Sequence, residues 1–207
     1  MQVNPYIEPL LRNATDLANT PPSSAAELEQ RWLRWGLIPS PRPVRDDDLE
    51  IATGFLTEWN RLVDAATEAA RVELLNDMLR RYTAPPSITD HDGSGWHLHY
   101  RDPKAAFGNT LAGATTASAA QFLCARGMRR LGRCELPDCD TAFVDFSRPG
   151  KQRYCSPACA NRGAVRRHRH HARTAAARSG VSAKPEGEGG AAMSCRFVQR
   201  DGRPARS

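Results

Sequence analysis

The stretches RCELPDC, residues 133–139, and YCSPACANR, residues 154–162, carry four cysteines in two close pairs. Cys134 pairs with Cys139, and Cys155 with Cys159, and 15 residues separate the two pairs. A segment of this length allows the pairs to meet. Structural Zn²⁺ sites use four soft ligands in a closed tetrahedron, and thiolates suit this ion well. The spacing therefore predicts one structural zinc ion bound by these four cysteines.

Two disulfides, or thiols that only fill a core, are the alternative interpretations of the four cysteines. Met1 leads into Asn4 and Pro5 without the apolar stretch behind basic residues that is typical of a secretory signal. We therefore expect a cytoplasmic protein, in which a thiol quartet more often binds metal than forms disulfides. Cys124 is expected to be a buried thiol, and Cys195 has no partner at a suitable spacing.

The residues around the second pair predict the local fold. Ser156 and Pro157 are a typical N-cap and first helical residue, so a helix is expected from there to about His171. Residues 142–146 have strand composition, and residues 152–154 return toward the metal after a turn. A knuckle, a β-hairpin and a helix that carries the last ligand is the order of a treble-clef finger.

The stretch from Arg133 to Arg169 resembles the CGNR zinc finger of bacterial proteins, which is named after its last cysteine and the three residues that follow it. The tetrad here is Cys159-Ala160-Asn161-Arg162, so alanine replaces the glycine of the family. Alanine is easily accommodated in a first helical turn. The Phe143-x-Asp145 segment is also similar to the family.

The N-terminal part resembles the ABATE domain, which precedes this finger in the family. The resemblance rests on Asn19-Thr20, on the segment from Trp32 to Leu37 and on GWHLHY, residues 95–100. Together the two resemblances cover about residues 5–173. They imply a stress-responsive transcription regulator, and RNA binding is another function suggested for the family.

Positive charge is concentrated in the C-terminal part of the chain. Residues 1–125 contain 11 basic and 16 acidic side chains, whereas residues 126–173 contain 12 basic and 4 acidic ones, a net charge of +8. This distribution is typical of a protein that binds a polyanion. The sequence contains no run of 18 apolar residues, so no membrane-spanning helix is expected.

Apolar residues at helical spacing predict a helix-rich domain before the finger. Residues 7–18 form the first helical pattern, and a capping box at Ser24 and Glu27 opens the second, which ends at Gly36. Three further helices are expected over residues 49–63, 72–82 and 104–125. In the second of these, the residues expected to face the core are Val72, Leu75, Leu79 and Tyr82. In the third, they are Phe107, Leu111, Ala114, Ser118 and Phe122.

A β-hairpin is expected near residues 87–100, between the fourth and fifth helices. Alternation places His97 and His99 on one face of its second strand. With His91 they could bind a metal, but we favour a solvated strand face.

These patterns predict a mainly α fold with small β-hairpins, in three parts. A helical, ABATE-like regulatory domain is expected over residues 1–125, a treble-clef-like zinc finger with a basic helix over residues 126–173, and a disordered tail over residues 174–207.

The predicted finger helix carries a stripe of arginines. Arg162, Arg166, Arg169 and Arg173 fall within about 60° of arc, and Arg167 lies beside them. Such a stripe suits phosphates or guanine edges. Arg162 could instead hold a carbonyl or Asp145, and Asn161 could brace the knuckle as a structural residue near the metal.

These features favour a nucleic-acid-binding protein, with DNA preferred over RNA as the partner. An RNA-binding protein, a protein-interaction module and a metal-dependent nuclease are the alternatives. No histidine lies between Cys139 and Cys155, and four cysteine ligands leave a zinc ion no open position. We therefore expect no catalytic residues and no cofactor besides zinc. An effector at the N-terminal domain and a second copy of the chain are further candidate partners.

Overall fold

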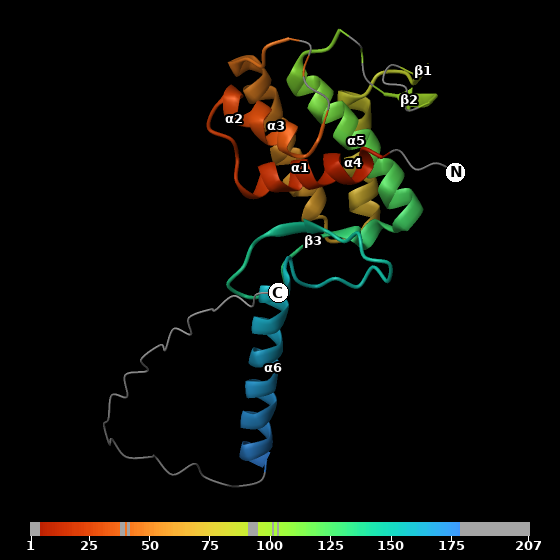
Figure 1. Cartoon of the computed structure of the whole chain (residues 1–207). Coiled ribbons are helices and arrows are strands. Elements are labelled where there is room, and N and C mark those ends of the chain that lie inside the picture. The colour runs from red at the N-terminus through yellow and green to blue at the C-terminus, as the bar shows by residue number, and fades with distance from the viewer. Residues whose placement is uncertain are drawn as a thin grey trace, which may run out of the picture. The chain divides into compact units, whose positions relative to one another are not determined.

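The computed structural model describes residues 5–37, 40, 42–90, 95–100, 102 and 104–178 (Figure 1). The chain divides after Arg166 into two units, which we describe separately. The first unit contains α1 (Ile7–Asn19), α2 (Ala25–Arg34), α3 (Asp46–Val63), α4 (Glu68–Tyr82) and α5 (Phe107–Arg126). Within the described ranges, no helix has both the length and the apolar character needed to cross a bilayer.

Side-chain hydrogen bonds mark the starts of α2, α3 and α5. The Ser24 hydroxyl accepts a hydrogen bond from the Glu27 backbone N–H at 3.2 Å, as predicted for the N-cap, whereas the Glu27 carboxylate accepts from the backbone N–H of Ser23 rather than of Ser24. The Asp48 carboxylate accepts two hydrogen bonds at helix starts, one from the backbone N–H of Arg45 at 3.0 Å and one from the backbone N–H of Gly108 at 2.8 Å. One buried carboxylate therefore joins the start of α3 to the start of α5.

Helix α5 is the central helix of the first unit and packs against α1, α3 and α4 (Figure 1). It is buried on nearly every side rather than on the single face predicted. Two glycines permit this, since a Cβ at Gly108 would lie 2.6 Å from the Asp48 carbonyl oxygen, and one at Gly113 would lie 2.5 Å from that of Tyr82. Cys124, predicted to be buried near the end of α5, is exposed.

The face that α4 turns to the core differs from the predicted one. Val72 is exposed, whereas Arg71, Leu75 and Met78 are buried. The spacing of apolar residues predicted the wrong face, because the buried face includes the charged residue Arg71, which a search for apolar residues does not count.

Three buried arginines bind the carbonyl ends of helices. Arg31 donates to the carbonyls of Asp16 and Thr20 at the end of α1. Arg71 donates to the Leu62 and Val63 carbonyls at the end of α3, and Arg130 to the Arg126 carbonyl at the end of α5. A guanidinium suits these positions, because helix C-termini carry unsatisfied carbonyls and partial negative charge.

The predicted hairpin near residues 87–100 is present. Strand β1 (Ser87–Thr89) pairs antiparallel with β2 (His97–His99), with Ile88 opposite Leu98. Ile88, Trp96 and Leu98 are exposed, and His99 is half-buried. His91 and the side chain of His97 lie outside the described residues, so the histidine metal pair stays a prediction.

The finger begins with a second hairpin, whose pairing differs from the prediction. Strand β3 (Leu131–Arg133), preceded by the 3-10 turn η1 (Met128–Arg130), pairs antiparallel with β4 (Ala142–Val144). Residues 152–154 are not a strand. The backbone of this segment serves other partners, since the Arg153 carbonyl accepts from Glu135 N–H and the Gln152 N–H donates to Asp145.

Strands β3 and β4 share a core with the N-terminal helices. Leu131, Ala142 and Val144 belong to the same buried cluster as the side chains of α1 and α5. The Asn19 side chain accepts from the Ala142 N–H at 2.8 Å and donates to its carbonyl at 2.9 Å. Arg133 binds both carboxylate oxygens of Asp64 at the end of α3. The hairpin that leads into the finger is thus anchored on the helices.

The last element is α6 (Pro157–Arg178). It begins at Pro157, as predicted, and continues seven residues beyond the predicted end at about His171, so the first residues assigned to a disordered tail are helical. Residues 179–207, which include Cys195 and the rest of that tail, lie outside the described residues.

Candidate metal centre

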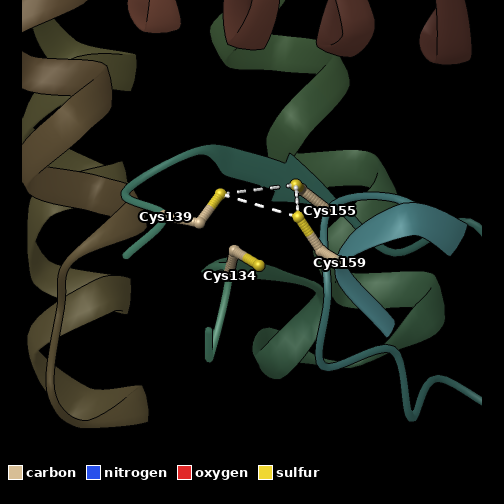
Figure 2. Close-up of side chains that lie close together, drawn as sticks. All are labelled: Cys134, Cys139, Cys155 and Cys159. Carbon is tan, nitrogen blue, oxygen red and sulfur yellow. Dashed lines mark hydrogen bonds between the residues drawn. The ribbon is translucent and has the colours of Figure 1, made fainter. Parts of the chain in front are cut away.

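The four cysteines predicted from their spacing converge on one point (Figure 2). The Sγ atom of Cys155 lies 3.7 Å from that of Cys139 and 3.6 Å from that of Cys159, and Cys139 and Cys159 are 3.9 Å apart. All four ligand atoms, Cys134 included, lie within 4.8 Å of one another. A tetrahedron with Zn–S bonds of about 2.3 Å requires sulfurs about 3.8 Å apart, so the donor set fits zinc.

The first pair of cysteines lies in a tight knuckle that follows β3. Cys134 is the residue directly after the strand, and its backbone N–H donates to the Thr141 carbonyl at 3.0 Å. The Cys139 N–H donates to the Leu136 carbonyl at 2.9 Å, which closes the turn. Leu136 is buried and packs in one cluster with Cys134 and Cys159. The knuckle therefore presents two thiols from one short loop.

The second pair is presented by the start of α6. The Ser156 hydroxyl accepts a hydrogen bond from the Cys159 backbone N–H at 3.2 Å, which confirms Ser156 as the N-cap. Cys159 consequently lies in the first helical turn. The positive end of the helix dipole stabilises a thiolate at this position.

The environments of the thiols favour unequal ionisation. Hydrogen bonding with Ser156 and with the Arg162 guanidinium lowers the pKa of Cys159 to about 6. Hydrogen bonds with Thr141 hold the pKa of Cys139 below its ordinary value, whereas burial and the neighbouring thiols raise the pKa of Cys155 to about 12. A divalent cation bound here would supply the positive charge that four thiolate ligands require.

The loop between β4 and α6 is organised around the buried carboxylate of Asp145. This carboxylate accepts hydrogen bonds from the backbone N–H groups of Ser147 at 2.8 Å and Gln152 at 2.9 Å. Burial raises its pKa, but these bonds and the nearby Arg130 outweigh burial and leave the pKa below its ordinary value. Arg130 also donates to the Asp145 and Ser147 carbonyls. Arg130, not Arg162, is therefore the arginine that supports Asp145.

Arg162 has other partners than the backbone carbonyl or Asp145 that the sequence suggested as its structural partners. Its guanidinium lies 3.4 Å from the Sγ atom of Cys159 and 3.4 Å from the carboxylate of Asp138. Asp138 also pairs with Arg166 at 3.4 Å. Two of the five arginines predicted to bind nucleic acid therefore face an acidic residue of the knuckle. Asn161, proposed as a structural residue, is exposed on α6.

The later part of α6, within the second unit, is exposed from Arg167 to Ala175. Arg167, Arg169 and Arg173 are exposed, as are the histidines between them. The helix contains six arginines and no acidic residue over its whole length. Its basic character is thus a property of the helix itself and does not depend on the placement of the units.

Sequence reasoning missed several residues that shape this centre. No local sequence pattern predicted the roles of Arg130 and Asp138, because the residues that they contact are distant in sequence. Gly163 packs against Tyr154, and a Cβ there would lie 2.6 Å from the tyrosine Oη. A glycine within a predicted helix, directly after the CGNR tetrad, was a usable signal for such a close approach.

Comparison with known families agrees with this geometry. The CGNR zinc finger matches residues 130–172, and the four clustered cysteines are its zinc site. The ABATE family, described as "Putative stress-induced transcription regulator", matches residues 11–126, more than half of the chain. No curated protein matches the sequence. The chain belongs to the ABATE family and carries a CGNR zinc finger after its ABATE domain.

Proposed function

We propose that the protein is a DNA-binding transcription regulator in which zinc holds the start of α6 and the arginines of that helix contact DNA phosphates. The observation that carries this proposal is the charge of α6, with six arginines and no carboxylate. The residues from Arg166 to Arg173 are all exposed. Membership of a family described as transcription regulators supports DNA as the partner.

Zinc has a structural role in this proposal. Four cysteine ligands fill a tetrahedral coordination sphere, so the ion offers no position to a substrate. It joins the knuckle to the first turn of α6, and thereby sets where the basic helix begins. The histidines of α6 are one or two residues from an arginine throughout, and they do not interrupt the basic surface.

The direct experiment is selection of bound sequences from random duplex DNA and RNA pools at one fixed salt concentration. Titration of the selected ligand over a range of salt then measures the number of phosphates neutralised. If about four phosphates are contacted on B-DNA, log K falls with log salt with a slope of about −3.6.

Arginine variants locate the contacts. Replacing Arg169 and Arg173 by alanine should flatten the slope by about 0.9 for each phosphate that the variant no longer neutralises. Arg80→Ala is a matched control, since Arg80 is an exposed arginine on α4, in the acidic part of the chain. It should leave the slope unchanged.

The outcomes separate the candidate functions. Enrichment of RNA over DNA would favour the RNA-binding alternative on the same surface. An affinity that responds neither to salt nor to the two arginine replacements would contradict nucleic-acid binding and favour a protein partner. A single finger buries a small area on DNA, so we expect a dimer on two half-sites, which footprinting of the selected sequence would reveal.

A further inference from the structure

Arg162 lies between a zinc ligand and a carboxylate of the opposite half of the site. One of its terminal nitrogens is 3.4 Å from the Sγ atom of Cys159, and the other is 3.4 Å from Oδ2 of Asp138. Asp138 directly precedes Cys139. The guanidinium therefore contacts Cys159, a ligand from the second cysteine pair, and Asp138, the residue next to a ligand from the first pair.

We propose that Arg162 is a positioning residue of the zinc centre, which stabilises the Cys159 thiolate and ties the first turn of α6 to the knuckle through Asp138. Arg162 is then not one of the phosphate contacts. The contacts to nucleic acid begin later along α6.

The charge of the site explains why an arginine is suited to this position. Four thiolates and one Zn²⁺ carry a net charge of −2, and a nearby guanidinium compensates part of it. Hydrogen-bond donors to ligand atoms orient them and tune the metal. The planar guanidinium presents separate N–H groups in a rigid fork, so it can bind a sulfur and a carboxylate at once, whereas the ammonium of lysine acts as a point charge.

Helix geometry places Arg162 at the required point. It follows Cys159 by three residues, so the two side chains share one face of α6. Arg166, one turn later, reaches the other oxygen of Asp138 at 3.4 Å. Arg166 therefore shares the carboxylate partner of Arg162 and differs from it in the contact with the thiolate, which makes it a matched control.

The two contacts of Arg162 should contribute unequally. The side chains of Arg162 and Asp138 are 55% and 50% exposed, and exposed ion pairs contribute little because solvent screens them. The hydrogen bond to the thiolate acts on the metal ligand itself. We therefore expect zinc affinity to fall most in Arg162→Ala, less in Asp138→Asn and not measurably in Arg166→Ala.

The test is a zinc competition titration of the full chain against a chromophoric chelator, without nucleic acid. Arg162→Ala should weaken zinc binding by about 10–100-fold, the usual effect of removing a partner of a metal ligand. Arg162→Lys should recover part of the loss. In the cobalt-substituted protein, the thiolate-to-cobalt charge-transfer band should shift in Arg162→Ala and stay in place in Arg166→Ala, which a general loss of stability would not produce.

Two results of the zinc titration would overturn the proposal. The first is wild-type zinc affinity in Arg162→Ala, and the second is an equal loss in Arg162→Ala and Arg166→Ala, which would indicate a bulk charge effect. The role of Arg162 at the zinc centre is tested without nucleic acid, so a failure of this proposal can be distinguished from a failure of the proposed function. A DNA salt slope that flattens in zinc-saturated Arg162→Ala would assign this arginine to the phosphates instead.

Discussion

Replacing Gly163 by alanine should destabilise the finger, although alanine is the better helix former. Gly163 lies in α6, and a Cβ built there would be 2.6 Å from Oη, 2.7 Å from Cζ and 2.8 Å from Cε1 of Tyr154. Unstrained carbon contacts are about 3.5–4.0 Å. The tyrosine ring must therefore move, and its backbone continues directly into the zinc ligand Cys155.

Two opposing effects set the size of the change. Alanine in place of glycine stabilises a helix interior by about 0.5–1 kcal/mol, whereas overpacking costs about 1–3 kcal/mol. We expect a net loss of about 1–2 kcal/mol in the free energy of unfolding of the zinc-loaded protein. Gly54→Ala is the control, because Gly54 is exposed on α3 and a Cβ there meets no atom within 4 Å. It should stabilise the protein by about 0.5–1 kcal/mol.

Urea unfolding and chelator competition measure the two consequences. Gly163→Ala should lower both the free energy of unfolding and the zinc affinity, and Gly54→Ala should raise the first without altering the second. Adding Tyr154→Leu to Gly163→Ala removes the three clashing atoms and should restore part of the loss, so the double-mutant cycle should show coupling. A Gly163→Ala protein as stable as Gly54→Ala would refute this reasoning.

Four further predictions concern zinc, the hairpin anchor, pH and the domain division. Cys155→Ser should lose stoichiometric zinc by elemental analysis, and the circular dichroism of the finger should fall while most helical signal persists, since structural zinc contributes about 10–16 kcal/mol of binding free energy in small fingers. Asn19→Ala leaves the backbone N–H and carbonyl of Ala142 unpaired and should cost about 1–3 kcal/mol in urea unfolding. The pKa of Asp145 is lowered in the folded state, so its stabilising effect is complete above the ordinary carboxyl pKa and is lost as the pH falls through the lower folded value. The stability deficit of Asp145→Asn should accordingly be constant near neutral pH and shrink in acid, and a deficit independent of pH would contradict the assignment. A chain ending after Gly127 should unfold cooperatively on heating. Its unfolding temperature should be lower than that of the full chain, because it lacks the apolar residues of β3 and β4 that cover the helices. A non-cooperative transition would contradict the domain division near residue 125.

Local patterns in the sequence were sufficient for the metal site and most helices. The paired spacing of Cys134, Cys139, Cys155 and Cys159 predicted the zinc centre, because a short turn places both thiols of a pair within reach of one ion. Ser156 predicted the start of α6 for a similarly local reason, since an N-cap acts within three residues. The concentration of positive charge in residues 126–173 could also be predicted from the sequence, because it depends on composition and not on folding.

Contacts between distant residues were decided by the tertiary structure. The partner of β4 proved to be β3 rather than residues 152–154, because the backbone of the later segment serves Asp145 and Glu135. Periodicity assigned α5 a single apolar face, but its glycines let neighbouring helices approach closely and bury it nearly all round. The ion pair of Arg162 with Asp138 could not be predicted from the sequence, because the two residues are 24 positions apart and meet where the cysteine cluster joins the knuckle to α6. Spacing along the chain predicts which side chains share a turn, whereas the partner of a charged side chain depends on which turns the folded core places side by side.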